Sequence, residues 1–249
     1  SHDALVARLL DPKMKAQILS EESMITSGPM RDLTALMGQV FPLGENPNYE
    51  PGPEDSIAGI AQIRGIDAME VMYDLLVAND GKELFYQPLG GYQGYSLEGQ
   101  KRLLEHPNVL FGLSDGGAHC GVIADAGMPT FIMTHWGRDR SKGEKMELEF
   151  IVQALTSKTA EAFGMFDRGL IREGMIADIN VIDFEALKLF RPEAIFDLPM
   201  GGRRLVQRAE GYDVTIKAGE VIFDKGEHTG ALPGKLVRRS DNRPTQIAS

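Results

Sequence analysis

Hydrophobic residues in the first third of the chain recur at the spacing of α-helices. At the start this pattern is formed by Leu5, Leu9, Met14, Ile18 and Leu19, with Asp3 as the expected N-cap. Two further helices are predicted, one over residues 57–64 after Asp55 and one that begins at Asp67 and ends at Asn79-Asp80-Gly81. Residues 38–54 hold seven Gly or Pro residues, which indicates a loop.

Strand-like and helical segments alternate in the middle of the chain. Residues 84–86 and 109–113 are short apolar runs typical of buried strands. Helices are predicted over residues 96–105, 147–155 and 157–163. Such alternation is typical of βα units around a parallel sheet, so we expect an α/β fold in which residues 84–113 contribute two parallel strands.

The pattern changes after Gly164 to the period-two alternation of half-buried strands. Residues 177–183, 214–217 and 220–223 alternate in this way, and Ala218-Gly219 between the last two predicts a tight hairpin turn. Residues 176–224 are therefore predicted to form antiparallel β-structure. The boundary between the two parts is expected near residues 165–176, and residues 240–249 form a polar end.

Composition narrows the class of protein. Of the 249 residues, 43% are hydrophobic and 25% are charged, which is typical of a globular chain rather than a disordered one. The formal net charge of −10 disfavours binding to nucleic acid or to an anionic membrane. Cys120 is the single cysteine, so an intrachain disulfide and a cysteine-rich zinc site are excluded. No signal peptide and no apolar run of about 20 residues is present, and we expect a cytoplasmic protein.

The strongest local candidate for chemistry is Gly-Leu-Ser-Asp-Gly-Gly-Ala-His at residues 112–119. A carboxylate directly after a predicted buried strand, on a glycine turn, stands where catalytic groups project from a (β/α)₈ barrel. Asp115 is therefore a candidate general base for an attacking water and a weaker candidate metal ligand. The alternative is that Asp115 only closes a turn or caps a helix.

Other polar residues nearby are candidates for substrate binding. His119 is a candidate ligand for substrate or metal, with a structural role in a loop as the alternative. Arg138 and Arg140 in the segment 135–140 are candidates to clamp a carboxylate, against the alternative of a surface turn with salt bridges. Cys120 follows His119, but the sequence supplies no third group to hold a base in place for a catalytic thiolate, so Cys120 is interpreted as buried or inert. The five histidines are scattered, and no zinc site with three protein ligands can be assembled from the sequence.

Several segments resemble the amidohydrolase superfamily, specifically its N-acyl-D-amino-acid deacylase (D-aminoacylase) branch. The segment 112–119 is similar to the strand-eight motif that carries the catalytic aspartate of that superfamily. The other segments that resemble the superfamily are 155–164, 167–183, 217–222 and 229–234. Two more segments, 48–51 and 135–139, narrow the resemblance to the deacylase branch. Together they cover most of residues 45–238.

The resemblance implies the C-terminal portion of a TIM barrel over residues 1–165 and a β-sandwich portion over 166–249. It also implies a zinc-dependent hydrolase of C–N bonds that deacylates an N-acyl amino acid, with Asp115 catalytic and His119 and Arg138 binding a small-molecule substrate. The histidine ligands of the family have no counterpart here and are expected upstream of residue 1. The chain would then start after about strand six, be inactive alone, pair with the missing N-terminal half, and form a homo-oligomer.

Two features leave alternatives open. Residues 120–127 contain no arginine where the D-aminoacylase branch places the one that grips the substrate carboxylate, so D-specificity stays open. The alternatives to deacylation are hydrolysis of cyclic amides, deamination, or a non-catalytic fragment or interaction module.

Overall fold

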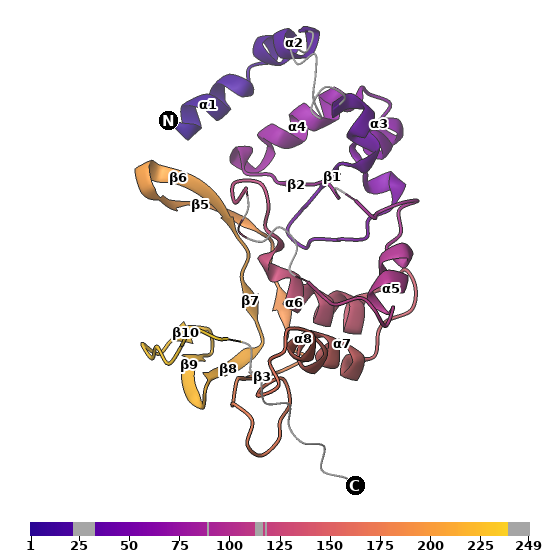
Figure 1. Cartoon of the computed structure of the whole chain (residues 1–249). Coiled ribbons are helices and arrows are strands. Elements are labelled where there is room, and N and C mark those ends of the chain that lie inside the picture. Colours follow the sequence, from indigo (N-terminus) through magenta and orange to yellow (C-terminus); the bar gives the residue numbers. More distant parts are fainter. Residues whose placement is uncertain (22–32, 89, 113–116, 118, 239–249) are drawn as a thin grey trace. The chain divides into compact units, whose positions relative to one another are not determined.

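The computed structural model describes residues 1–21, 33–88, 90–112, 117 and 119–238 (Figure 1). The chain divides into two compact units, which we call unit 1 (Ser1–Lys101) and unit 2 (Arg102–Ser249). Within the described ranges, no helix is both long and apolar enough to cross a membrane. The predicted division into a barrel portion and a sandwich portion near residue 165 stays a prediction.

Unit 1 is mainly helical, and capping residues begin its helices. Its helical elements are α1 (His2–Leu9), α2 (Pro12–Ser20), η1 (Leu33–Gln39), η2 (Pro53–Asp55), α3 (Ile57–Arg64), α4 (Ala68–Gly81) and α5 (Glu98–Leu104). The predicted N-cap Asp67 is confirmed, because its carboxylate accepts a hydrogen bond from the amide of Met69 at 2.8 Å. Ser56 caps α3 in place of the predicted Asp55, which accepts from the amide of Gly52 at 2.9 Å instead.

The first predicted helix is two helices. The side chain of Asp11 accepts from the amide of Lys13 at 2.9 Å and starts α2, with Pro12 at the first helical position, where its missing N–H costs nothing. Ser1, rather than the predicted Asp3, caps α1. The core of the unit lies elsewhere and is formed by buried residues from η1, α3 and α4 and the residue after η1, namely Met37, Val40, Ile57, Ala61 and Val71.

The strands predicted in the middle of the chain are only partly confirmed. β2 (Phe85–Tyr86) is a strand as predicted, but it pairs antiparallel with β1 (Phe41–Pro42). Residues 109–112 form no strand, because the amide of Val109 bonds the carbonyl of His106 at 3.0 Å and its own carbonyl accepts from Lys158 Nζ at 2.7 Å. The predicted parallel strands are therefore wrong for the described residues, in which every strand pair is antiparallel.

Helices also occupy the first half of unit 2. They are η3 (Asp125–Gly127), α6 (Met128–Phe131), η4 (Ile132–Asp139), α7 (Leu148–Leu155) and α8 (Ser157–Ala162). The helices predicted over 147–155 and 157–163 are confirmed. The helix η4 has π-helical hydrogen bonding, a rare geometry that sequence periodicity does not signal.

The second half of unit 2 is antiparallel β-structure, as predicted. One sheet has the order β10-β9-β8-β3, formed by β3 (Ile179–Ile182), β8 (Tyr212–Lys217), β9 (Glu220–Asp224) and β10 (Glu227–His228). Two further strand pairs form separate two-stranded sheets. One pairs β4 (Lys188–Leu189) with β7 (Ala209–Glu210). The other pairs β5 (Glu193–Leu198) with β6 (Gly202–Val206), and η5 (Pro199–Gly201) connects β5 to β6.

The hairpin turn predicted at Ala218-Gly219 is confirmed. Both residues have positive φ angles, of 52° and 85°, and Lys217 pairs with Glu220 across the turn. Two consecutive left-handed residues give the twist that a two-residue hairpin requires. The class of the chain is thus mixed α/β with antiparallel sheets, and its assignment to part of a TIM barrel and of a β-sandwich stays a proposal.

Candidate functional site

The predicted catalytic residue Asp115 lies outside the described residues, as do its neighbours 113, 114, 116 and 118. The described residues around it are Gly112, Gly117 and His119. Gly117 has a φ of 93°, which glycine adopts freely. The glycine in this motif therefore stands where the backbone requires one.

The predicted substrate ligand His119 is exposed and has a φ of 44°. Its carbonyl accepts hydrogen bonds from the amides of Val122 at 2.8 Å and Ile123 at 3.1 Å, which closes a turn directly after it. A left-handed conformation is uncommon for a residue with a side chain and persists only where surrounding contacts enforce it. An exposed imidazole on a constrained turn is suited to contact a ligand, and this role stays a prediction.

The residues after His119 are bonded to strand β6. The carbonyl of Cys120 accepts from the amide of Leu205 at 2.6 Å, and the carbonyl of Gly121 accepts from Arg203 Nη2 at 3.0 Å. The free thiol of Cys120 is half-buried. These two hydrogen bonds attach the segment after His119 to strand β6.

Arg138, the second predicted substrate ligand, lies near the end of the π-helix η4. Its guanidinium donates to the backbone carbonyls of Phe184, Glu185 (3.1 Å) and Leu187 (2.8 Å), and its Cζ lies 5.6 Å from the centre of the Phe184 ring. It also forms a bidentate pair with Asp139 at 2.7 and 3.0 Å, which raises the pKa of Arg138 above its ordinary value. The side chain is thus engaged with the loop before β4, and a role in holding a substrate carboxylate stays a prediction.

Two other residues of the segment 135–140, Trp136 and Arg140, are buried at the end of η4, while Asp139 is exposed. Trp136 and Arg140 each have 2% of their surface exposed. The Arg140 guanidinium lies 4.8 Å from the centre of the indole ring and donates to the carbonyl of Glu144 at 2.9 Å. The amide of Met146 bonds the carbonyl of Trp136 at 2.8 Å. These contacts fix the turn from η4 to α7, so they indicate a structural role.

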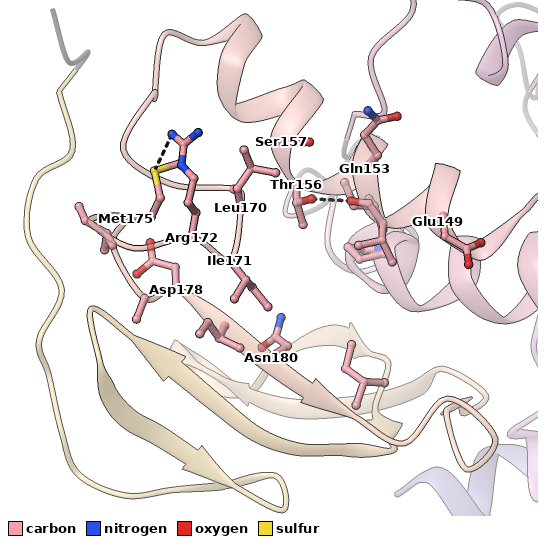
Figure 2. Close-up of a pocket in the computed structure, with 18 of the residues that line it drawn as sticks. Glu149, Gln153, Thr156, Ser157, Leu170, Ile171, Arg172, Met175, Asp178 and Asn180 are labelled. Atoms are coloured by element: carbon pink, nitrogen blue, oxygen red, sulfur yellow. Dashed lines mark hydrogen bonds between the residues drawn. The ribbon is translucent and has the colours of Figure 1, made fainter. Parts of the chain in front are cut away.

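A cleft of about 1520 Å³ opens in unit 2 between helices α7 and α8, the loop 169–177 and strand β3 (Figure 2). Its lining is mostly apolar, and Leu170 and Ile171 point toward it from the loop. The carboxylate of Asp178 at its edge is held by Lys217 and Arg168, each at 2.8 Å. Of the predicted site residues that the structure describes, neither His119 nor Arg138 lines this cleft. The cleft therefore offers mostly apolar surface, with the carboxylates of Glu149, Glu173 and Asp178 among its lining residues.

A buried polar cluster in unit 1 surrounds Glu50, which belongs to the segment 48–51 singled out by the sequence. Glu50 has 3% of its surface exposed and accepts from the amide of Leu97 at 2.8 Å. The Tyr92 hydroxyl donates to the carbonyl of Pro51, and burial, followed by the charge of Glu50, raises the pKa of Tyr92. Asn48 accepts from the amide of Glu50 at 3.0 Å. The cluster fixes the loop between β1 and η2, a role that its spacing in the sequence did not predict.

The described residues were also tested for a metal site. No group of three or more His, Cys, Asp or Glu side chains among them is arranged to hold a metal ion. The sequence resemblance places the histidine ligands of zinc upstream of residue 1, so the zinc that it implied stays a proposal.

Comparison with known proteins gives one match. A model of the amidohydrolase family matches residues 41–223. No curated protein and no solved structure matches the chain. The matched range includes residues 112–119, the π-helix and most of the strand region.

Proposed function

The chain belongs to the amidohydrolase family, and on this basis we propose that the protein hydrolyses a linear amide and removes the acyl group of an N-acyl amino acid. Membership of this family by itself supports hydrolase activity, and the substrate class is the further step of the proposal. The observation that carries the proposal is the family match over residues 41–223, which encloses the Gly-Leu-Ser-Asp-Gly-Gly-Ala-His motif. The motif supplies a carboxylate of the kind that amide hydrolysis needs to move a proton.

The proposed reaction needs water, a base and a proton donor for the leaving group. The water oxygen attacks the amide carbon while Asp115 takes one water proton. The C–N bond then breaks, the proton passes from Asp115 to the leaving nitrogen, and the products are a carboxylate and an amine. His119 contacts the substrate from the adjacent turn.

A zinc ion is part of the proposal because the family is usually metal-dependent, and such an ion would polarise the carbonyl. The histidine ligands of that ion are expected upstream of residue 1, and the described residues contribute no cluster of three donors to it. Stereochemical preference is left open by the proposal, because residues 120–127 contain no arginine.

The decisive variant is Asp115→Asn in the full-length protein as encoded. Asparagine keeps the shape of the side chain but is not a base, so kcat/KM for an N-acyl amino acid should fall by about 10²–10⁴. The melting temperature and the metal content should stay unchanged. The matched control is Asp125→Asn, an exposed carboxylate ten residues later in η3, which should keep wild-type activity.

A panel of N-acetyl-D- and N-acetyl-L-amino acids, one cyclic amide and one exocyclic amine tests the substrate class. Turnover of the cyclic amide or the amine alone would replace deacylation by the corresponding amidohydrolase chemistry. An Asp115→Asn variant that retains near wild-type kcat/KM would remove this residue from the mechanism.

A further inference from the structure

The strand region of unit 2 contacts the segment after His119 at three successive places. The first two are the hydrogen bonds from Leu205 to Cys120 and from Arg203 to Gly121, at 2.6 and 3.0 Å. The third is a close approach at Gly127.

At this third place, a Cβ on Gly127 would lie 2.7 Å from Gln207 Oε1 and 2.9 Å from Leu189 Cδ1. Gln207 is itself held, because its Nε2 donates to the carbonyl of Phe190 at 2.9 Å. Residues 120 and 121 at the start of this segment and Gly127 at its end therefore lie against the chain around residues 203–207.

From these contacts we infer that the β5–β6 ribbon positions His119, and that Arg203 is the positioning residue through which it acts. Arg203 donates to the carbonyl two residues after His119, so it acts on the turn and not on a substrate. The inference rests on the proposed function, in which His119 contacts the substrate.

The ribbon is built to hold a fixed shape. Arg204 of β6 forms a bidentate pair with Asp197 of β5 at 2.7 and 2.6 Å, and Arg208, two residues after β6, pairs with Glu193 of β5 at 2.9 Å. Four further backbone positions are in register between β5 and β6. A ribbon fastened in this way provides a stable edge for Cys120 and Gly121.

The backbone of His119 has a conformation that needs support from neighbouring contacts. A φ of 44° in a residue with a side chain relaxes unless neighbouring contacts determine it. The hydrogen bonds from the amides of Val122 and Ile123 to the His119 carbonyl fix the backbone turn that follows His119. The bonds of Cys120 and Gly121 to β6 fix the position of that turn in the unit. Loss of one of them is expected to misplace the imidazole without unfolding the ribbon.

The test compares Arg203→Ala, Arg203→Lys and Arg208→Ala in the full-length protein. Arg208 is the matched control, since it is an exposed arginine two residues after β6 whose guanidinium donates to Glu193 of β5. Arg203→Ala should lower kcat by about three- to tenfold, the size expected for one lost hydrogen bond, with an unchanged melting temperature. Arg203→Lys should restore at least half of the activity, because an ammonium group also donates to the Gly121 carbonyl.

A second readout does not depend on catalysis. Cys120 is the single cysteine, so its rate of reaction with a soluble maleimide reports on the turn alone. Arg203→Ala should raise this rate at least about threefold, since it removes the Arg203–Gly121 bond, one of the two bonds that hold Cys120 and Gly121 to β6. Arg203→Lys and Arg208→Ala should stay close to the wild-type rate.

The outcomes separate the two proposals. Equal kcat and equal maleimide rates in Arg203→Ala and Arg208→Ala would overturn the inference. A faster maleimide reaction with unchanged kcat would overturn the positioning role of Arg203. A wild-type protein that hydrolyses none of the panel would sink the proposed function, and the maleimide rates would still decide whether the ribbon holds the turn.

Discussion

Unit 1 and the strand region of unit 2 (residues 179–228) are stabilised in different ways. In unit 1, large apolar side chains are fully enclosed: Ile57 and Val71 have no exposed surface and Phe41 has 1%. In the described strands β3–β10 no residue is buried, and between residues 179 and 228 Leu187 alone reaches full burial. The strand region relies instead on paired backbones and on charge pairs across neighbouring strands.

The difference shows what an alternating pattern does and does not determine. A period-two pattern is sufficient to predict strands and their turns, and here it did so for the hairpin at Ala218-Gly219. A sheet gains most of its stability only when its apolar face packs on a second layer. The exposed fractions of Phe196 (68%) and Val181 (45%) show that the described residues do not supply such a layer at these positions.

The largest effect is expected from the core of unit 1. Ile57→Ala removes a fully buried side chain of the cluster with Val40 and Val71, so it should lower the free energy of unfolding by about 2–5 kcal/mol. The control is Ile63→Ala on the same helix, where 74% of the side chain is exposed and the change should stay within about 0.5 kcal/mol. Thermal and denaturant unfolding measure both. Equal effects would show that α3 does not bury the face described.

The strand region should be most sensitive where the backbone itself is crowded. A Cβ on Gly211, whose φ is 92°, would lie 2.5 Å from the Cα of Leu187, the buried residue of this region. Gly211→Ala should therefore cost about 2–4 kcal/mol.

Gly219→Ala is the matched control for this substitution. Its φ of 85° imposes the same backbone strain in open space, so it should cost about 1–2 kcal/mol. Hydrogen exchange of the β4 and β7 amides distinguishes the two variants. A Gly211→Ala variant no worse than Gly219→Ala would mean that Leu187 can move aside.

A smaller effect is expected from the charge pairs. Burial opposes ionisation of Asp178, but hydrogen bonds from Lys217 and from the amide of Ala218 outweigh it and lower the pKa of Asp178. A lowered folded-state pKa contributes stability above the unfolded value, near 4, and that contribution is lost as the pH falls through the folded value.

Asp178→Asn should accordingly cost about 0.5–1 kcal/mol at pH 7, with the difference from wild type shrinking on acidification below pH 4. Exposed Asp224 on the same sheet gives the control variant, Asp224→Asn. Unfolding curves measured from pH 7 to pH 2 test the trend. A difference that grows in acid would contradict the assigned sign.

The smallest effect on folding is expected at the tip of the ribbon. Met200 is fully exposed and Phe196 is 68% exposed, so Met200→Ser with Phe196→Ser should change the melting temperature little. Exposed apolar side chains promote association, so light scattering should show the 249-residue chain self-associating and the double variant doing so less. A wild-type chain that is monomeric at high concentration would contradict this expectation.

The sequence by itself determined the features that neighbouring residues control. The start of α4 at its capping residue Asp67, the end of α3 at Gly65 with its left-handed φ of 67°, and the left-handed hairpin turn follow from local chemistry. Such features depend on contacts between residues that are only a few positions apart, so they can be predicted from the sequence. The same holds for the motif at residues 112–119, where glycines and a carboxylate are visible without any fold.

Only the tertiary structure decided the long-range features. The apolar run at 109–112 was read as a strand, but Lys158, 49 residues later, takes the carbonyl of Val109. The sequence also did not indicate that the Arg138 guanidinium donates to the carbonyls of Phe184, Glu185 and Leu187, while its role as a substrate clamp stays a prediction. The attachment of the turn after His119 to Arg203 and Leu205 likewise joins residues more than 80 positions apart. Side-chain type restricts which hydrogen bonds a residue can make. Its partner, however, is whichever group the folded chain brings within reach, and the local sequence pattern does not show which distant residue that is.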